Sequence, residues 1–325
     1  MNSTTDSGPS VRVTTQAERV APDGSEQLFL SGVMLAIAGT FLFALKSILI
    51  KFAFNAGADS TLLLMLRLSL SLPFYVGMLL YLRSGSFTGQ PKHLKRRHVA
   101  AATGLGFFGY YLASFLDMAG LERISAQLER LTLFTYPAMI AVLAWLFLGE
   151  RMTRRIVASI LLTYLGIVVM YSQEREAMAV STNQTATGVF LVLGSALSYS
   201  VYVLLAKPLM QKMGSREFTS YAMIGSAVFI ACHFFATRSL ADLTSANPIV
   251  YVYSLGLAFV CTVIPSFLIS EAIVRLGAAR TTIIGSVGPV MTMMLAIFVL
   301  GEATSAQHIA GMLIVLLGVS FVAKK

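Results

Sequence analysis

Long apolar runs separated by short polar segments fill most of this 325-residue chain. Runs of about 20 apolar residues are long enough to cross a bilayer as α-helices, and a helix satisfies its own backbone hydrogen bonds there. The pattern predicts ten such helices joined by short connections. Their expected ranges are roughly 29–52, 61–82, 98–118, 125–148, 154–171, 187–206, 218–236, 249–270, 280–300 and 305–322.

The second half of the chain repeats the pattern of the first half. The segments "TYPAMIAVLAWLFLGERMT", from Thr135, and "VGPVMTMMLAIFVLGEATS", from Val287, share a proline and an LGE triplet at an offset of 152 residues. The helices that contain Gly32 and Gly188 align at an offset of 156 residues. Because five helices are duplicated and five is odd, the second copy enters the membrane from the opposite side. The expected fold is therefore an all-α integral membrane protein with ten transmembrane helices in two inverted five-helix repeats.

Five regions follow from this pattern. The first repeat is expected over residues 29–171 and the second over residues 187–322, with an outer linker over 172–186. Residues 1–28 are polar, rich in Ser and Thr, and are expected to form a disordered cytoplasmic tail. Residues 323–325 form a basic cytoplasmic end. No cleavable signal peptide is expected, because the first apolar run begins late and is long enough to span the membrane.

Basic residues lie almost entirely on one side of the predicted helices. Seventeen Lys and Arg residues fall in the tail, the even-numbered loops and the C-terminal end, whereas the opposite loops hold only Arg123, Arg175 and Arg238. Lys and Arg are retained on the cytoplasmic side, so both termini are expected to be cytoplasmic. The net charge of +9 thus reflects membrane orientation, and no nucleic-acid partner is expected.

The composition agrees with a membrane protein and gives no sign of an enzyme. The mean hydropathy is +0.76 and only 12% of residues are charged, about half the usual share of soluble chains. Cys232 and Cys261 both fall inside predicted helices, where a thiol behaves as a small apolar group. The chain has no nucleotide-binding P-loop and no Cys/His cluster with metal-ligand spacing, so no catalytic residue, metal or cofactor is expected.

The order of the motifs resembles a known family. Each half has a Pro-containing helix that ends in "LGE" and a Gly-containing last helix, while "IKF" closes the first helix and "LRL" lies in the second. These features resemble the drug/metabolite transporter superfamily, and specifically its EamA-type domains, over about residues 29–322. The resemblance implies a secondary transporter or exporter of small organic solutes in a bacterial inner membrane. It implies no particular substrate and no oligomeric state.

Several charged residues interrupt the apolar runs, which makes them candidates for the transport site or for proton coupling. Five of them are expected to form one outward-facing cluster with a net charge of +1. The alternative is that they serve the structure, as ion pairs of Asp117 with Arg130 or of Glu129 with Arg67, and as an interfacial Lys51. The five residues are Lys51, Arg67, Asp117, Glu129 and Arg130.

Lys46 lies about two turns inside the first helix, too deep to reach the interface comfortably. It is expected to line a solvated cavity, with a buried ion pair as the alternative. The second half lacks matching charges, so polar residues there are expected to form the opposite wall, or else to serve helix packing. Such a site suits a solute with a carboxylate or another anionic group and an apolar or hydroxylated part. The wall residues are Tyr199, Tyr202, Ser266, Thr281 and Thr282.

Pro137 and Pro289 are expected to lie inside the fourth and ninth helices and to kink them, either as fixed bends or as hinges. Glu150 and Glu302 are expected to stabilise the helix that follows each of them. The favoured function is a proton-coupled or facilitative exporter of a small metabolite, with Glu129 or Asp117 as the proton carrier. The alternatives are an importer of a vitamin or nucleotide-like compound, and a membrane sensor or scaffold that transports nothing.

Overall fold

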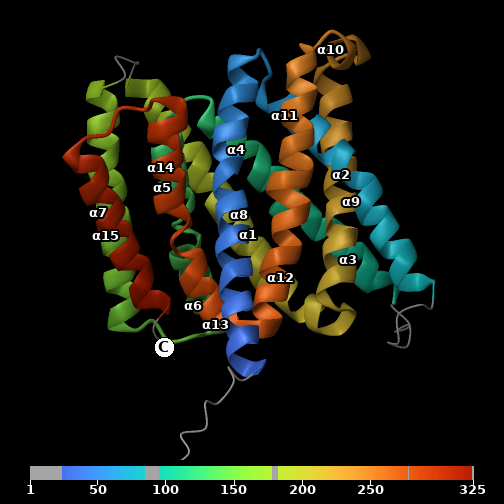
Figure 1. The fold of residues 1–325 in the computed structure, drawn as a ribbon, viewed down its shortest axis with the longest axis horizontal. Coiled ribbons are helices and arrows are strands. Elements are labelled where there is room, and N and C mark those ends of the chain that lie inside the picture. Colours follow the sequence, from blue (N-terminus) through green and yellow to red (C-terminus); the bar gives the residue numbers. More distant parts are fainter. Residues whose placement is uncertain (1–23, 85–94, 178–181, 277, 324–325) are drawn as a thin grey trace, which may run out of the picture.

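The computed structural model describes residues 24–84, 95–177, 182–276 and 278–323 (Figure 1). All regular structure within these ranges is helical. Eight helices there are long and apolar enough to cross a membrane, and two shorter apolar helices, Gly288–Leu300 and Ala306–Ser320, complete the expected set of ten. The predicted fold class is confirmed.

The first half contains five spans, of which the third is continuous but irregular and the fourth is broken. Its elements are α1 (Gly24–Asn55), α2 (Ser60–Arg83), α3 (Arg96–Gly106), the π-helix η1 (Phe107–Leu112), α4 (Ala113–Leu121), α5 (Ala126–Leu133), α6 (Tyr136–Leu148) and α7 (Arg154–Ala177).

The second half has the same order, with one additional short helix, α10. Its elements are α8 (Thr182–Met213), α9 (Ser215–Thr237), α10 (Leu240–Thr244), α11 (Pro248–Ala258), the π-helix η2 (Phe259–Val263), α12 (Ile264–Leu276), α13 (Ala278–Gly285), α14 (Gly288–Leu300) and α15 (Ala306–Ala323).

The helices extend beyond the apolar runs that predicted them. Helix α1 begins at Gly24, inside the expected tail, and residues 1–23 lie outside the described part of the chain. Helices α7 and α8 extend into the expected linker, of which only 178–181 lies outside both. Hydropathy marks where a helix meets lipid, whereas each added backbone hydrogen bond extends a helix that has already formed.

The irregular segments of the two halves coincide under the repeat. The π-helices start at Phe107 and Phe259, which are 152 positions apart. Helices α6 and α14 both end at a glycine with φ of +67°, Gly149 and Gly301, again 152 apart. π-helices and helix breaks are rare, so their recurrence at one offset supports a duplicated fold more strongly than hydropathy alone.

The last helices of the two halves cross closely, and α7 and α15 lie side by side in Figure 1. A Cβ atom added at Gly166 would lie 2.6 Å from the carbonyl oxygen of Gly311, and one at Gly318 would lie 2.9 Å from that of Ser159. The repeat offset relates Gly166 to Gly318 and Ser159 to Gly311. The same contact therefore occurs twice with the halves exchanged, as a two-fold axis in the membrane plane requires.

The largest buried apolar cluster joins both halves. It includes Ile48 of α1, Met118 of α4, Ile230 of α9 and Leu257 of α11. The outer faces of the helices carry large exposed apolar side chains, as expected of surfaces that meet lipid. The buried charged residues described below, such as Asp117 and Glu129, therefore lie inside the helix bundle, behind its apolar outer faces.

Two nearby glycines allow the packing of α3 against α9 to be tested. A Cβ at Gly106 would lie 2.0 Å from the carbonyl oxygen of Ala222, whereas a Cβ at Gly104 would meet nothing within 4 Å. We expect Gly106→Ala to destabilise the purified protein by about 1–3 kcal/mol, because α9 must move to admit the methyl group. The measurement is the thermal unfolding midpoint in detergent. Gly104→Ala is the matched control and should leave the midpoint unchanged or raise it; equal effects of both variants would contradict this close approach.

Candidate transport site

Two neighbouring residues of α1 bind two buried carboxyl groups. Lys46 Nζ lies 2.6 Å from Asp117 Oδ2 on α4, and Ser47 Oγ donates to Glu129 Oε2 on α5 at 2.7 Å. Asp117 is 2% exposed and Glu129 is fully buried. The structure thus brings α1 together with α4 and α5, which lie 71 and 82 residues away at these contacts, and it places their polar groups inside the bundle.

The two carboxyl groups bind consecutive residues of α1, and each leaves one oxygen without a partner among the described residues. Asp117 Oδ1 and Glu129 Oε1 are buried and accept no hydrogen bond from the described residues. A hydrogen bond between two carboxyl groups requires a proton on one of them, because an ionised carboxylate only accepts. Asp117 and Glu129 together have one ammonium partner, Lys46, so a proton on either carboxyl group would lower the uncompensated buried charge.

These partners differ from the expected ones. Asp117 pairs with Lys46 and not with Arg130, while Glu129 binds Ser47 and not Arg67. Lys46 has the ion pair that was the alternative to cavity lining, although 14% of its side chain remains exposed. The sequence identified the charged residues but carried no information on which helices pack together. The partner of each charged residue depends on that packing.

Arg67 connects the first half to the π-helix of the second. Its Nε and Nη2 donate to Thr262 Oγ1 at 3.1 and 3.0 Å, and Thr262 Oγ1 in turn donates to the carbonyl oxygen of Leu257 at 2.7 Å. Arg67 Nη1 is buried and has no hydrogen-bond partner among the described residues. Thr262 was missed by the sequence analysis. A signal was available, because Thr262 is the repeat equivalent of Tyr110 in η1 and is polar within an apolar run.

Arg130 lies at the start of two half-helices. A Cβ at Gly288, the first residue of α14, would lie 3.6 Å from Arg130 Nη2. The first residue of α6, Tyr136, follows Arg130 by six positions along the chain. The N-caps of these helices, Thr135 and Val287, provide no side-chain cap, and Arg130 Nε is buried without a partner among the described residues. A helix start carries partial positive charge, so a guanidinium beside it favours an anion between them.

The two prolines sit differently from the expected kinks. Pro137 and Pro289 are the second residues of α6 and α14, which follow two-residue breaks after α5 and α13. In the first turn of a helix the missing N–H of proline removes no hydrogen bond. The fourth and ninth spans are therefore discontinuous helices, and the expectation of prolines inside continuous kinked helices is wrong. A hinge role for Pro137 and Pro289 stays a prediction.

Tyr199 and Tyr202 belong to a cluster of aromatic rings beside α6. The hydroxyl of Tyr202 donates to that of Tyr110 at 3.1 Å, and the rings of Tyr199 and Tyr136 meet edge to face with centroids 5.4 Å apart. Tyr202 is only 3% exposed, and its ring fills the space above Gly109. The cluster joins the halves through packing, and it includes Tyr136, the first residue of α6.

The positions of the other three predicted wall residues do not bear directly on substrate binding. Ser266 Oγ donates to the carbonyl oxygen of Val263 at 2.7 Å, and Thr281 is buried at 4% exposure. The side chain of Thr282 lies outside the described part of the structure. For these three residues a role in binding stays a prediction.

The N-terminal end of α5 is held by the opposite repeat. Glu302 Oε1 accepts from the backbone N–H of Ala126 at 2.8 Å, and Oε2 accepts from that of Gln127 at 3.3 Å. Lys51 Nζ donates nearby to the carbonyl oxygen of Ile124 at 2.7 Å. Glu302 was expected to stabilise the helix that follows it, α15, but it caps α5 of the other half instead.

We expect Glu302→Gln to lower the free energy of unfolding by about 1–2 kcal/mol, because a neutral amide binds the α5 N-terminus more weakly than a carboxylate. Denaturation of the purified protein in detergent measures this loss. Glu150→Gln changes the repeat equivalent, whose side chain is exposed, and should have little effect. An equal loss in both variants would show that the cap across the repeats is not the cause.

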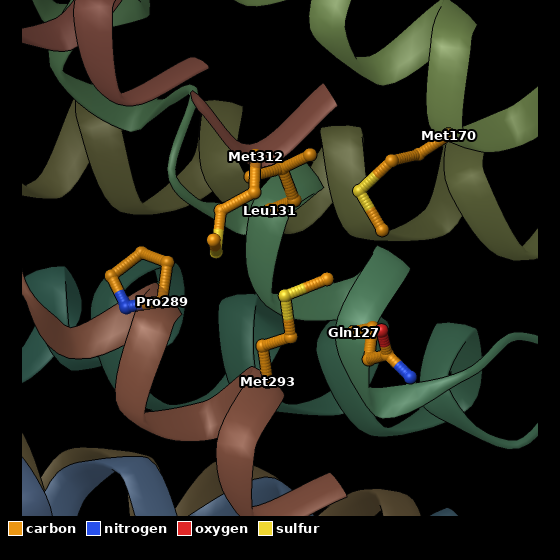
Figure 2. Close-up of a pocket in the computed structure, with 6 residues that line it drawn as sticks. All are labelled: Gln127, Leu131, Met170, Pro289, Met293 and Met312. Carbon is orange, nitrogen blue, oxygen red and sulfur yellow. The ribbon is translucent and has the colours of Figure 1, made fainter. Parts of the chain in front are cut away.

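A small pocket lies on another face of α5. It is only about large enough for one water molecule and lies where α5 and α7 of the first half meet α14 and α15 of the second (Figure 2). Its lining is mostly apolar and includes three flexible methionines, so it does not suit a charged group. The lining residues are Gln127, Leu131, Met170, Pro289, Met293 and Met312.

Comparisons with known proteins agree with the duplicated fold. The model of the EamA-like transporter family matches residues 30–172 and again residues 186–324. The uncharacterized transporter YcbK of Bacillus subtilis is 29% identical, over 86% of this chain and 89% of the relative. An uncharacterized transporter of Archaeoglobus fulgidus is 27% identical, over 72% of this chain and 81% of the relative.

A solved crystal structure shares the fold, with a TM-score of 0.58 at 16% identity over 90% of this chain and 96% of the other. Both halves thus match one family in the order that the repeat predicts, and the relatives are named as transporters. The protein is a multi-pass membrane transporter, and the chain belongs to the EamA-like transporter family.

Proposed function

We propose that this transporter carries small carboxylate-bearing metabolites by alternating access, through a site between the repeats formed by Arg67, Arg130 and the starts of α6 and α14. The observation that carries the proposal is the position of Arg130. Its guanidinium lies beside the first residue of α14, and its Nε is buried without a partner among the described residues. Discontinuous helices that direct their N-termini at an anionic substrate recur in secondary transporters.

The charge balance supports an anionic substrate. Lys46 and Asp117 compensate each other in a close ion pair. Arg67 and Arg130 have no carboxylate partner within 4.0 Å among the described residues, and each has one orphan guanidinium nitrogen. A charge enclosed by apolar helices is costly unless it is paired or hydrated, so a substrate carboxylate would be stabilised there. The neighbouring tyrosine cluster suits an apolar or hydroxylated remainder.

The proposal includes proton coupling, with Glu129 or Asp117 as the carrier, and a location in a bacterial inner membrane with both termini cytoplasmic. The excess of Lys and Arg in one set of loops supports that orientation. Export of a metabolite is the direction that the family resemblance favours. Import of a vitamin or nucleotide-like compound is the second candidate, because a phosphate would fit the same pair of guanidinium groups.

Arg130→Gln tests the site. Lactate, phenylacetate and N-acetyltyrosine, each compared with its uncharged amide, are titrated against the purified protein while thermal stabilisation is followed. At least one carboxylate should bind more tightly than its amide. Arg130→Gln should raise its dissociation constant roughly 10- to 150-fold, the equivalent of a charge-assisted hydrogen bond of about 1.5–3 kcal/mol.

Arg123→Gln is the matched control, because Arg123 lies at the outer loop before α5 and is 38% exposed. It should leave carboxylate binding unchanged. Amides that bind as tightly as the acids, or a loss of equal size in the control, would rule out an anion site at Arg130.

A further inference from the structure

We infer that the anion and a proton bind this site together, with Glu129 taking the proton, so that both cross the membrane in the same direction. The inference rests on the proposed function and adds to it the sign of the coupling. It depends on Glu129 and Arg130 being consecutive residues of one short helix, α5, with Glu129 bound to Ser47, the chain neighbour of Lys46 in the Lys46–Asp117 ion pair.

The groups around Glu129 come from three elements. Lys46 and Ser47 approach from α1, Asp117 from α4, and Arg130 lies on α5 itself. Helices α7, α8 and α14 also pack against α5, and no hydrogen bond or ion pair joins Glu129 to their described residues. The protonation of Glu129 therefore depends on a small set of charges, to which a bound substrate would add one.

A substrate carboxylate at Arg130 would add one negative charge to this set. While Glu129 is ionised, the substrate would be a third carboxylate beside Asp117 and Glu129. A proton on Glu129 removes one of these negative charges and so weakens the repulsion. By thermodynamic reciprocity, the anion must then favour the proton as strongly as the proton favours the anion.

The net charge of the site supports the same pairing. The five charged residues Lys46, Arg67, Asp117, Glu129 and Arg130 sum to +1 when both carboxyls are ionised. A proton alone raises this to +2, and a monovalent anion alone lowers it to 0. Binding both restores +1. The empty site and the fully loaded site thus carry the same charge, so the helices around them can rearrange between inward and outward forms at similar electrostatic cost.

This coupling is the opposite of exchange. In an exchanger the substrate and the proton compete for one carboxylate, as a cationic substrate would do here. With joint binding, the proton moves down its own gradient and the anion moves in the same direction with it. Across an inner membrane with an inward proton gradient, this transporter would therefore take its anion up, which favours the import alternative over export.

The test measures protons directly. Purified protein in weakly buffered detergent, at a series of pH values from neutral to mildly alkaline, is mixed with N-acetyltyrosine, whose carboxylate is fully ionised throughout, while a pH indicator follows the solution. Lactate and phenylacetate are run alongside. We expect uptake that approaches one proton per anion bound, and a dissociation constant that rises up to tenfold per pH unit as the medium becomes more alkaline.

Glu129→Gln keeps an oxygen that can accept from Ser47 but cannot take a proton. It should bind the anion without proton uptake and with an affinity independent of pH. Glu271→Gln is the control, because Glu271 is 46% exposed and pairs with Arg275 on its own helix, and it should behave as the wild type. If Glu129→Gln fails to fold, the pH dependence of the wild type still decides the sign.

The outcomes separate the two proposals. Proton release on binding, or binding without any proton change, would overturn joint binding while leaving the anion site intact. Proton uptake that persists in Glu129→Gln would overturn the assignment of the proton to Glu129. Failure of all three carboxylates to bind the wild type would overturn both the anion site and the coupling.

Discussion

Lys46→Ala is expected to lower the free energy of unfolding by about 3–5 kcal/mol, because it leaves Asp117 buried without its cation. Asp117 is 2% exposed, and Lys46 is its only salt-bridge partner among the described residues. Removing one member of a buried ion pair costs the desolvation of the other. The measurement is chemical denaturation of the purified protein in detergent, which reports the loss as a shift of the midpoint.

Removing both charges should restore most of the stability. Lys46→Ala combined with Asp117→Ala leaves no unpaired charge, so the double variant should be more stable than Lys46→Ala alone. Lys51→Ala, one turn further along α1, removes a hydrogen bond to a backbone carbonyl and should cost about 1 kcal/mol. Near-normal stability of Lys46→Ala would instead support a solvated ammonium that lines a cavity.

The sequence was sufficient for the fold because hydropathy and duplication are both one-dimensional signals. Apolar runs of span length gave the number of helices, and the constant offset between Pro137 and Pro289 gave the inverted repeat. The helix breaks could not be read in the same way. Neither Phe134 nor Thr135 is a helix breaker, so the proline was the only sign of irregularity. A proline fits both a kink and the start of a new helix.

The candidate site was predictable in its residue types but not in its contacts. Asp117, Glu129 and Arg67 attract attention in any apolar run, because charge in a membrane must be paired or used. Their partners depend on which helices pack together and on the rotation of each helix. The π-helix η2 decides the contact of Arg67 with Thr262, and an extra residue per turn leaves no trace in hydropathy.

Glu129→Gln is expected to abolish accumulation driven by a pH gradient while preserving exchange. In proteoliposomes with labelled N-acetyltyrosine, one proton per anion allows a gradient of one pH unit to support about tenfold accumulation on the alkaline side, since both correspond to about 1.4 kcal/mol. Glutamine resembles the protonated carboxyl, so the variant can still bind the anion and alternate between its inward and outward forms. Its site cannot release a proton, however, and the empty site therefore cannot complete the proton-driven cycle. The inside concentration should therefore not rise above the outside concentration when the pH gradient is applied.

Exchange of labelled for unlabelled N-acetyltyrosine at equal pH needs no change of protonation, so Glu129→Gln should perform it at a rate similar to that of the wild type. Protein-free liposomes correct for passive entry of the neutral acid, and Glu271→Gln serves as the matched acidic control. A Glu129→Gln variant that still accumulates the probe in response to the pH gradient would show that Glu129 is not the coupling residue. Its hydrogen bond from Ser47 would then serve only to hold α1 against α5.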